Sequence, residues 1–187
     1  REFAKVAGPN ELAVATFNVE NLDPSDPPDK FDQLAGLIVN NLKSPDIVAL
    51  EEIQDANAPV NNGVVDGGPT LDALVAAISA AGGPAYSYRQ INPVNNADGG
   101  EPGGNIRVGF IFRTDRGLSF VDRPGGTATT ATGVVAGPDG AELTFSPGRI
   151  DPTNPAFNAS RKPLVGEFRW RGQTLFAIVN HFNSKGG

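Results

Sequence analysis

The clearest pattern in the chain is a short apolar run that ends in two adjacent carboxylates. The segment IVALEE, residues 47–52, follows the turn residues Ser44-Pro45. A short apolar run bounded by turn residues predicts a buried strand, here over residues 46–51. Residues 12–19, LAVATFNV, are almost continuously apolar, which is typical of a central strand that is covered on both faces.

A helix is predicted between these two strands, from about residue 30 to 43, with Asp29 as its N-cap. Its apolar positions recur at spacings of three and four and are Phe31, Leu34, Ile38 and Leu42. A strand, a helix and a strand of these lengths predict a right-handed unit with parallel strands, whose carboxyl ends meet at one edge of the sheet. We therefore expect Asn18 and Glu52 side by side at that edge. Alternation along the strand predicts that Glu51 points the opposite way.

The rest of the chain predicts short strands separated by long polar loops. A second helix is expected from its cap, Thr70, to the pair Gly82-Gly83. The further strands are predicted at 86–91, 106–112, 118–122, 127–135, 143–145, 164–170 and 174–180, the last two joined by a hairpin turn at Arg171-Gly172. The loops at 55–69 and 92–105 are rich in Asn, Gly and Pro, and loops of this length are usually functional or mobile.

Composition narrows the class of protein. The 187 residues suffice for one domain over residues 1–187, and no apolar run is long enough for a membrane span. The formal net charge is −6, so the chain does not attract nucleic acid by its overall charge. A protein of this charge that handles phosphates needs a metal ion or a local basic cluster. Cysteine is absent, so disulfides cannot contribute to stability.

Both ends of the sequence suggest a piece of a longer polypeptide. The chain begins at Arg1 without a signal peptide, which suggests processing. It ends on a predicted strand followed at once by the polar and glycine residues HFNSKGG. We therefore expect an incomplete domain.

Three polar side chains are predicted to arrive at one rim of the sheet. Glu52 offers oxygen ligands to a hard cation such as Mg²⁺, although a strand-end glutamate can also pair with a lysine or remain solvated. Asn18 can orient a metal ligand or a phosphate oxygen, or it can cap the next turn. His181, the only histidine, can protonate or hydrogen-bond a phosphoryl oxygen near neutral pH, or serve a structural role.

Further polar groups in the second half of the chain suit contacts to phosphate. Arg161 precedes a predicted strand and carries the fork that binds phosphate through two hydrogen bonds, although it can also be a solvated strand start. Asn183, Ser184 and Lys185 follow the histidine and supply amide, hydroxyl and ammonium groups that suit phosphate.

Five stretches, taken in order, resemble the endonuclease/exonuclease/phosphatase superfamily, the group of pancreatic deoxyribonuclease and exonuclease III. They are ATFNVENL, PDIVALEEIQD, NIRVGFIFR, SRKPLVGEF and AIVNHFNSKGG, and they cover nearly the whole chain. The last is most similar to secreted bacterial nucleases of this group, which implies an extracellular or cell-surface location. The resemblance implies a layered α/β sandwich of the deoxyribonuclease type, incomplete at the C-terminus.

The resemblance also implies an activity, metal-dependent phosphodiester hydrolysis of nucleic acid, with DNA favoured. Mg²⁺ is the implied metal, with Mn²⁺ or Ca²⁺ as alternatives. Glu52, and not Glu51, matches the metal-binding glutamate of the family. Asn18, Arg161 and His181 match its catalytic positions around the phosphate.

The resemblance also makes Asn183 and Lys185 candidates for contacts to the substrate.

Two features of the family's pattern are missing from this sequence. The aromatic residue that precedes the NIRVGFIFR strand in related nucleases has no counterpart, since Gly103-Gly104-Asn105 stands there. The family's later Gly-Asp-x-Asn segment and its terminal Asp-His pair, which activates the attacking water, are also absent. The resemblance therefore implies the N-terminal part of such a domain, and the 187 residues alone are expected to be inactive or poorly active without the missing C-terminal half.

Two alternatives stay open from the sequence. Within the same superfamily, the substrate can be a phospholipid or a sugar phosphate. From another class, the chain can be a non-catalytic, secreted binding module. Only the enzyme hypothesis requires Asn18, Glu52 and His181 to converge in one cleft.

Overall fold

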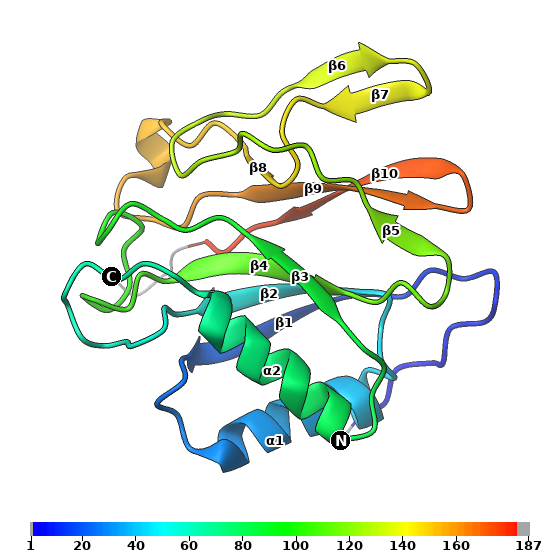
Figure 1. Ribbon diagram of the computed structural model, residues 1–187, viewed down its shortest axis with the longest axis horizontal. Helices are drawn as coiled ribbons and strands as arrows, with labels where there is room; N and C mark the ends of the chain where they lie inside the picture. The colour runs from blue at the N-terminus through cyan, green and yellow to red at the C-terminus, as the bar shows by residue number, and fades with distance from the viewer. Residues whose placement is uncertain (1, 183–187) are drawn as a thin grey trace.

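The computed structural model describes residues 2–182 and consists of two sheets packed face to face, with two helices on the outer side of the first sheet (Figure 1). The first sheet has the order β1-β2-β4-β3 and the second has the order β10-β9-β5, with β8 paired to β9. A separate hairpin, β6–β7, lies beyond the second sheet (Figure 1). The chain is therefore a mixed α/β protein, as the sequence predicts.

The strands are β1 (Val14–Leu22), β2 (Ile47–Ile53), β3 (Ser87–Gln90), β4 (Arg107–Phe112), β5 (Leu118–Phe120), β6 (Val134–Gly137), β7 (Gly140–Leu143), β8 (Gly148–Arg149), β9 (Leu164–Trp170) and β10 (Gln173–Val179). The helices are α1 (Pro28–Gly36), which continues into a π-helical turn over Leu37–Asn41, and α2 (Gly68–Ala80); a 3₁₀ turn spans Pro155–Phe157.

The first strand-helix-strand unit is confirmed, since β1 and β2 pair in parallel. The predicted N-cap is wrong, because α1 begins at Pro28, one residue before Asp29, and no side chain caps it. Proline at the first helical position has its backbone angle already fixed and lacks the N–H that would need a cap. Asp29 lies instead in the first turn, where its negative charge suits the helix dipole.

The cap predicted for the second helix is also wrong. α2 begins at Gly68, and Thr70 is buried inside its first turn. The Thr70 hydroxyl donates to the carbonyl oxygens of Gln54 (3.0 Å) and Asp55 (3.3 Å), so it ties the helix to the chain that leaves β2. The predicted stop is confirmed, since the helix ends at Ala80, before Gly82 takes up a positive φ of 82°.

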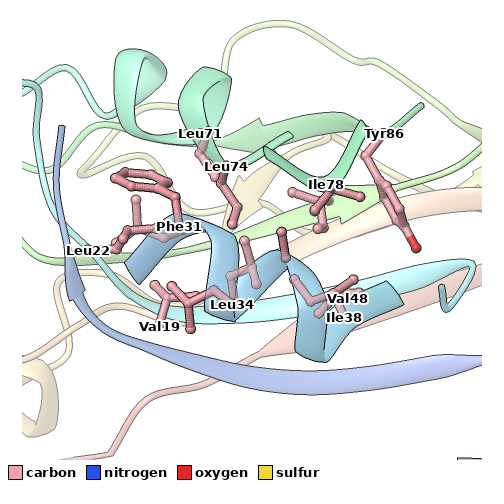
Figure 2. Packing of buried hydrophobic residues seen from close by; sticks show 14 residues of the cluster. Val19, Leu22, Phe31, Leu34, Ile38, Val48, Leu71, Leu74, Ile78 and Tyr86 are labelled. Atoms are coloured by element: carbon pink, nitrogen blue, oxygen red, sulfur yellow. The ribbon is translucent and has the colours of Figure 1, made fainter. Parts of the chain in front are cut away.

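The two helices cover the first sheet with the apolar faces that the sequence predicts. Figure 2 shows their side chains meeting those of β1 and β2. The buried cluster includes Val19, Leu22, Phe31, Leu34, Ile38, Val48, Leu71, Leu74, Ile78 and Tyr86. Leu42 packs at the border of this cluster and is only partly buried.

Four phenylalanine rings fill the centre of the space between the sheets. The Phe168 ring meets the rings of Phe110, Phe112 and Phe120 edge-on, at centroid distances of 5.8, 5.5 and 4.9 Å. Phe112 and Phe120 stack at 5.4 Å. Edge-on and offset contacts place the positive ring edge against the negative face, so this arrangement stabilises the packing of the two sheets beyond the area that it buries.

The exposure of β1 and β4 differs from the pattern of their sequences. β1 was expected to be central but lies at the edge of the described sheet, with Val14 60% exposed and with Thr16 and Asn18 also exposed. Only its alternate side chains pack against the helices. β4, whose residues alternate, is buried at all six positions because the helices cover one of its faces and the second sheet covers the other.

Three predictions for the later strands are only partly right. In the segment 127–135, the strand begins only at Val134, and Ala131 forms a single bridge to Arg149. The strand expected at 143–145 ends at Leu143, and the segment between this strand and the one expected at 164–170 contains the short strand β8, which was not predicted. The hairpin between β9 and β10 is confirmed, and its turn residues Arg171 and Gly172 both have positive φ, as a tight two-residue turn requires. No helix in the described part of the chain has the length and apolar character needed to cross a bilayer.

We predict that Phe168→Ala lowers the free energy of unfolding by about 3–5 kcal/mol, because it removes the ring that the other three share and leaves a cavity. The exposed Val60 provides a control, and Val60→Ala should change stability by less than about 0.5 kcal/mol. Denaturant unfolding followed by circular dichroism measures both. Equal losses in the two variants would show that the phenylalanine cluster does not hold the sheets together.

Candidate functional site

Strand β2 is distorted at its two glutamates. Between Leu50 and Ile53, the pair Glu51 and Glu52 lies opposite a single residue of β4, Val108. Glu52 has a φ of 64°, in the left-handed region that non-glycine residues rarely adopt. This is a β-bulge, a feature that redirects side chains and is common beside functional sites.

The bulge places both glutamates on the same side of the sheet. Glu51 Oε1 accepts a hydrogen bond of 2.5 Å from the Thr16 hydroxyl on β1, and Glu52 Oε1 lies 3.5 Å from Nε2 of His181. The negative charges of both carboxylates act to raise the pKa of the same imidazole, that of His181. The prediction that Glu51 and Glu52 point in opposite directions is therefore wrong, because the extra residue of the bulge breaks the alternation.

His181 follows directly after β10 and lies between opposite charges. Its side chain is 18% exposed and that of Glu52 is 23% exposed. Burial lowers the pKa of His181 and the positive charge of Arg161 lowers it further, while the carboxylates of Glu52 and Glu51 act in the opposite direction. The net pKa is below the ordinary 6.5, so the ring is neutral at pH 7 and its contact with Glu52 is not an ion pair at that pH.

Arg161 completes this group. Its Nη2 donates to the carbonyl oxygen of Phe182, the residue after the histidine, at 3.3 Å. Nε of Arg161 and Nδ1 of His181 are both buried and have no hydrogen-bond partner among residues 2–182. Buried polar atoms normally have partners, so these two atoms suit a polar ligand or ordered water at this position. Arg161, Glu52 and His181 thus lie together. The sequence predicts the meeting of Glu52 and His181, and the resemblance implies the place of Arg161 beside them.

Asn18 lies one strand away from this group. Its partner in the β1–β2 register is Glu51, so the prediction that it neighbours Glu52 directly is wrong by one residue. Its Oδ1 accepts from the backbone N–H of Glu20 at 2.8 Å, which is the turn-capping role that the sequence left open. Asn18 also lines a cavity of about 280 Å³ along the flank of α1. No hydrogen bond joins it to Glu52 or His181 in the described chain. Asn183 and Lys185 lie outside the described residues.

Carboxylate oxygens are the groups at this site that a metal could use. Within residues 2–182, no three His, Asp or Glu side chains are grouped as a metal cluster. Mg²⁺ usually takes only one or two carboxylates and completes its shell with water and phosphate oxygens.

Comparisons of the chain with protein-family models, curated proteins and solved structures found no match. The chemistry of the site therefore has to be inferred from these residues.

A buried polar network beside the site was not predicted. Arg107 is fully buried and donates to the carbonyl oxygens of Val65 (2.6 Å) and Asn105 (2.9 Å) and to Oδ1 of Asn92 (2.6 Å). Burial lowers its pKa to about 10. These bonds fix the loops that follow β2 and β3 to the start of β4. One signal was present in the sequence, an arginine inside the apolar run NIRVGFIF, but its partners are distant in the chain.

We predict that the single histidine titrates with a pKa below 6.5 in the folded protein. Glu52→Gln should lower this pKa further, because it removes a negative charge beside the ring, and Arg161→Gln should raise it. The folded state disfavours the charged ring, so the contribution of His181 to stability should fall as the pH drops below 6.5.

The measurement is a proton NMR titration of the imidazole signals. Arg169→Gln removes a half-exposed arginine that pairs with Asp139 and serves as the matched control, with no expected change. A pKa that responds equally to all three substitutions, or to none of them, would contradict the described geometry.

Proposed function

We propose that this chain contributes to a Mg²⁺-dependent phosphodiesterase, an extracellular nuclease that acts on DNA. The observation that supports the proposal most strongly is the 3.5 Å approach of the Glu52 carboxylate to the His181 imidazole, with Arg161 beside them. These groups come from three distant parts of the sequence. A carboxylate, an imidazole and a guanidinium at one rim are the groups that phosphate-ester hydrolysis with a divalent cation needs.

The donor atoms fit a hard divalent cation. Glu52 would hold it, since its carboxylate is only partly exposed and is turned out of the helix-side core by the bulge. The Glu51 carboxylate adds negative charge next to it, while the Thr16 hydroxyl keeps that carboxylate in place. When bound there, Mg²⁺ would polarise the scissile phosphate and stabilise negative charge on the leaving oxygen.

His181 and Arg161 would bind and orient the phosphate. The neutral ring directs Nε2 toward the Glu52 carboxylate, which favours the proton on that nitrogen. An anionic phosphoryl oxygen at the same place would receive this N–H and be stabilised as charge develops. The Arg161 fork can donate two hydrogen bonds to the same phosphate.

The overall architecture is compatible with this proposal. Two packed sheets with helices outside are what a deoxyribonuclease-type sandwich requires, and the sequence resemblance supports that finer assignment and the secreted location. The net charge of −6 agrees with a site where a bound cation and one arginine provide the local attraction for phosphate.

We predict that the natural full-length protein cleaves DNA only when Mg²⁺ or Mn²⁺ is present. Glu52→Gln and His181→Ala should each reduce the rate by about 100-fold or more, the range found for removal of a group that acts on the reacting centre. A plasmid-nicking assay with and without a chelator measures the rate.

Asp139→Asn is the matched control for the loss of a carboxylate, because this exposed side chain lies in the β6–β7 turn. Its rate should equal that of the unmodified protein. Full cleavage by both site variants would make the site assignment wrong. Cleavage of a phospholipid or sugar phosphate instead of DNA would contradict the substrate class.

A further inference from the structure

A second cavity lies at the tip of the loop between β3 and β4. It has a volume of about 310 Å³ and is lined by Asn61, Asn96, Gly99, Gly100, Glu101 and Pro102. The loops that form it, 54–67 and 91–106, lie at the same end of the molecule as the C-terminal end of β10 (Figure 1). No residue of this cavity belongs to the group formed by Glu52, Arg161 and His181.

The residues of this cavity contact two segments that carry residues of the candidate site. Glu101 Oε2 accepts from Nε2 of Gln54 at 3.4 Å, and Gln54 follows Glu52 by two positions. On the other side, a Cβ added to Gly99 would lie 2.3 Å from the carbonyl oxygen of Ala159 and 3.6 Å from Nη1 of Arg161. The loop therefore touches the segment that carries Arg161.

Buried charges hold the loop in this position. Asp98 is 4% exposed and pairs with Nζ of Lys162 at 2.7 Å and with Nη1 of Arg149 at 3.6 Å. Within the loop, Oδ1 of Asn96 accepts from the N–H of Gly103 at 2.8 Å. A recognition surface that is fixed before binding loses little conformational entropy when the ligand arrives.

The groups that face this cavity suit a neutral ring with both donors and acceptors. Oδ1 of Asn61 accepts from Nδ2 of Asn96 at 2.9 Å, and no residue between 2 and 182 accepts from Nδ2 of Asn61, so this amide can donate to a ligand. The Glu101 carboxylate can accept two N–H groups and repels a phosphate. Gly99 and Gly100 line the cavity with backbone alone, and the side on which each would carry a Cβ packs against Ala159 and Ile106 respectively.

Guanine matches this arrangement best among the bases. Its O6 accepts one hydrogen bond, and its N1–H and N2–H lie side by side as two donors, which a carboxylate receives in a bidentate manner. Adenine lacks this pair of donors. Bases that leave the stack are commonly read through this edge.

We infer that this cavity is a base-recognition subsite for a guanine nucleotide next to the scissile phosphate, with Glu101 as the specificity-determining residue. The place of this subsite in catalysis rests on the proposed function, but the binding of the base does not.

The test uses the 187-residue chain and ¹H–¹⁵N NMR titrations with 5′-GMP and 5′-AMP, which share the same phosphate. 5′-GMP should shift the amide signals of Gly99, Gly100 and Glu101, and 5′-AMP should bind at least about tenfold more weakly because a bidentate pair is lost. Glu101→Gln should weaken the binding of 5′-GMP by about tenfold and leave the affinity for 5′-AMP unchanged. Asp139→Asn is the control and should change neither affinity.

Equal binding of both nucleotides, an absence of shifts at Asn61 and residues 96–103, or an unchanged affinity for 5′-GMP in Glu101→Gln would overturn the inference. Glu101 is exposed, so its substitution should preserve the fold, and Asn61→Ala provides a second variant that should also weaken the binding of 5′-GMP.

The subsite and the proposed function can be disproved independently of each other. If guanine binds as described but the full-length protein does not cleave DNA, only the proposed function is wrong. If DNA is cleaved but 5′-GMP does not bind here, only the subsite is wrong.

Discussion

The bulge at Glu51 and Glu52 is the constraint on which the site depends. In a regular strand, Glu52 would point with Leu50 into the apolar layer beneath the helices, where an unpaired carboxylate costs many kcal/mol, of the order of tens in the idealised limit. A left-handed backbone conformation at a non-glycine residue costs only about 1–3 kcal/mol. The bulge is therefore the cheaper solution. Leu50 and Ile53, both 0% exposed, hold the strand on either side of it.

A packed phenylalanine cluster and a buried polar network together hold the segments that form the site. The phenylalanine cluster fixes the second sheet against the first, so His181, directly after β10, reaches the end of β2. The buried Arg107 fixes the loops around that end without a carboxylate as its direct partner. Its hydrogen bonds to backbone and amide oxygens satisfy most of its donors, although burial still lowers its pKa. Such a network orders long loops that have few apolar contacts of their own.

Much of this fold could be predicted from the sequence, because the apolar periodicities of α1, α2 and the long strands are strong. The local start of each helix could not, since Pro28 and Gly68 begin the helices ahead of the expected caps Asp29 and Thr70. The sequence predicted that Asn18, Glu52 and His181 meet at one rim, and the resemblance implied a place for Arg161 at the phosphate. In the structure, Arg161 rather than Asn18 lies with Glu52 and His181. Two features were not predicted: the position of Glu51 on the same side of the sheet as Glu52, and the pairing of Asn18 with Glu51 instead of Glu52. Both follow from the bulge, which depends on tertiary packing and has no signal in strand alternation.

We propose above all that the redirected carboxylate of Glu52 holds a divalent cation beside His181. Addition of Mn²⁺ to the ¹⁵N-labelled chain tests it most directly, because the paramagnetic ion broadens the NMR signals of nearby nuclei. We expect the imidazole signals of His181 and the amide signals of residues 51–54 to broaden first, and we expect Glu52→Gln to abolish this effect. Broadening confined to the acidic loop at residues 23–32, or unchanged broadening in Glu52→Gln, would contradict it.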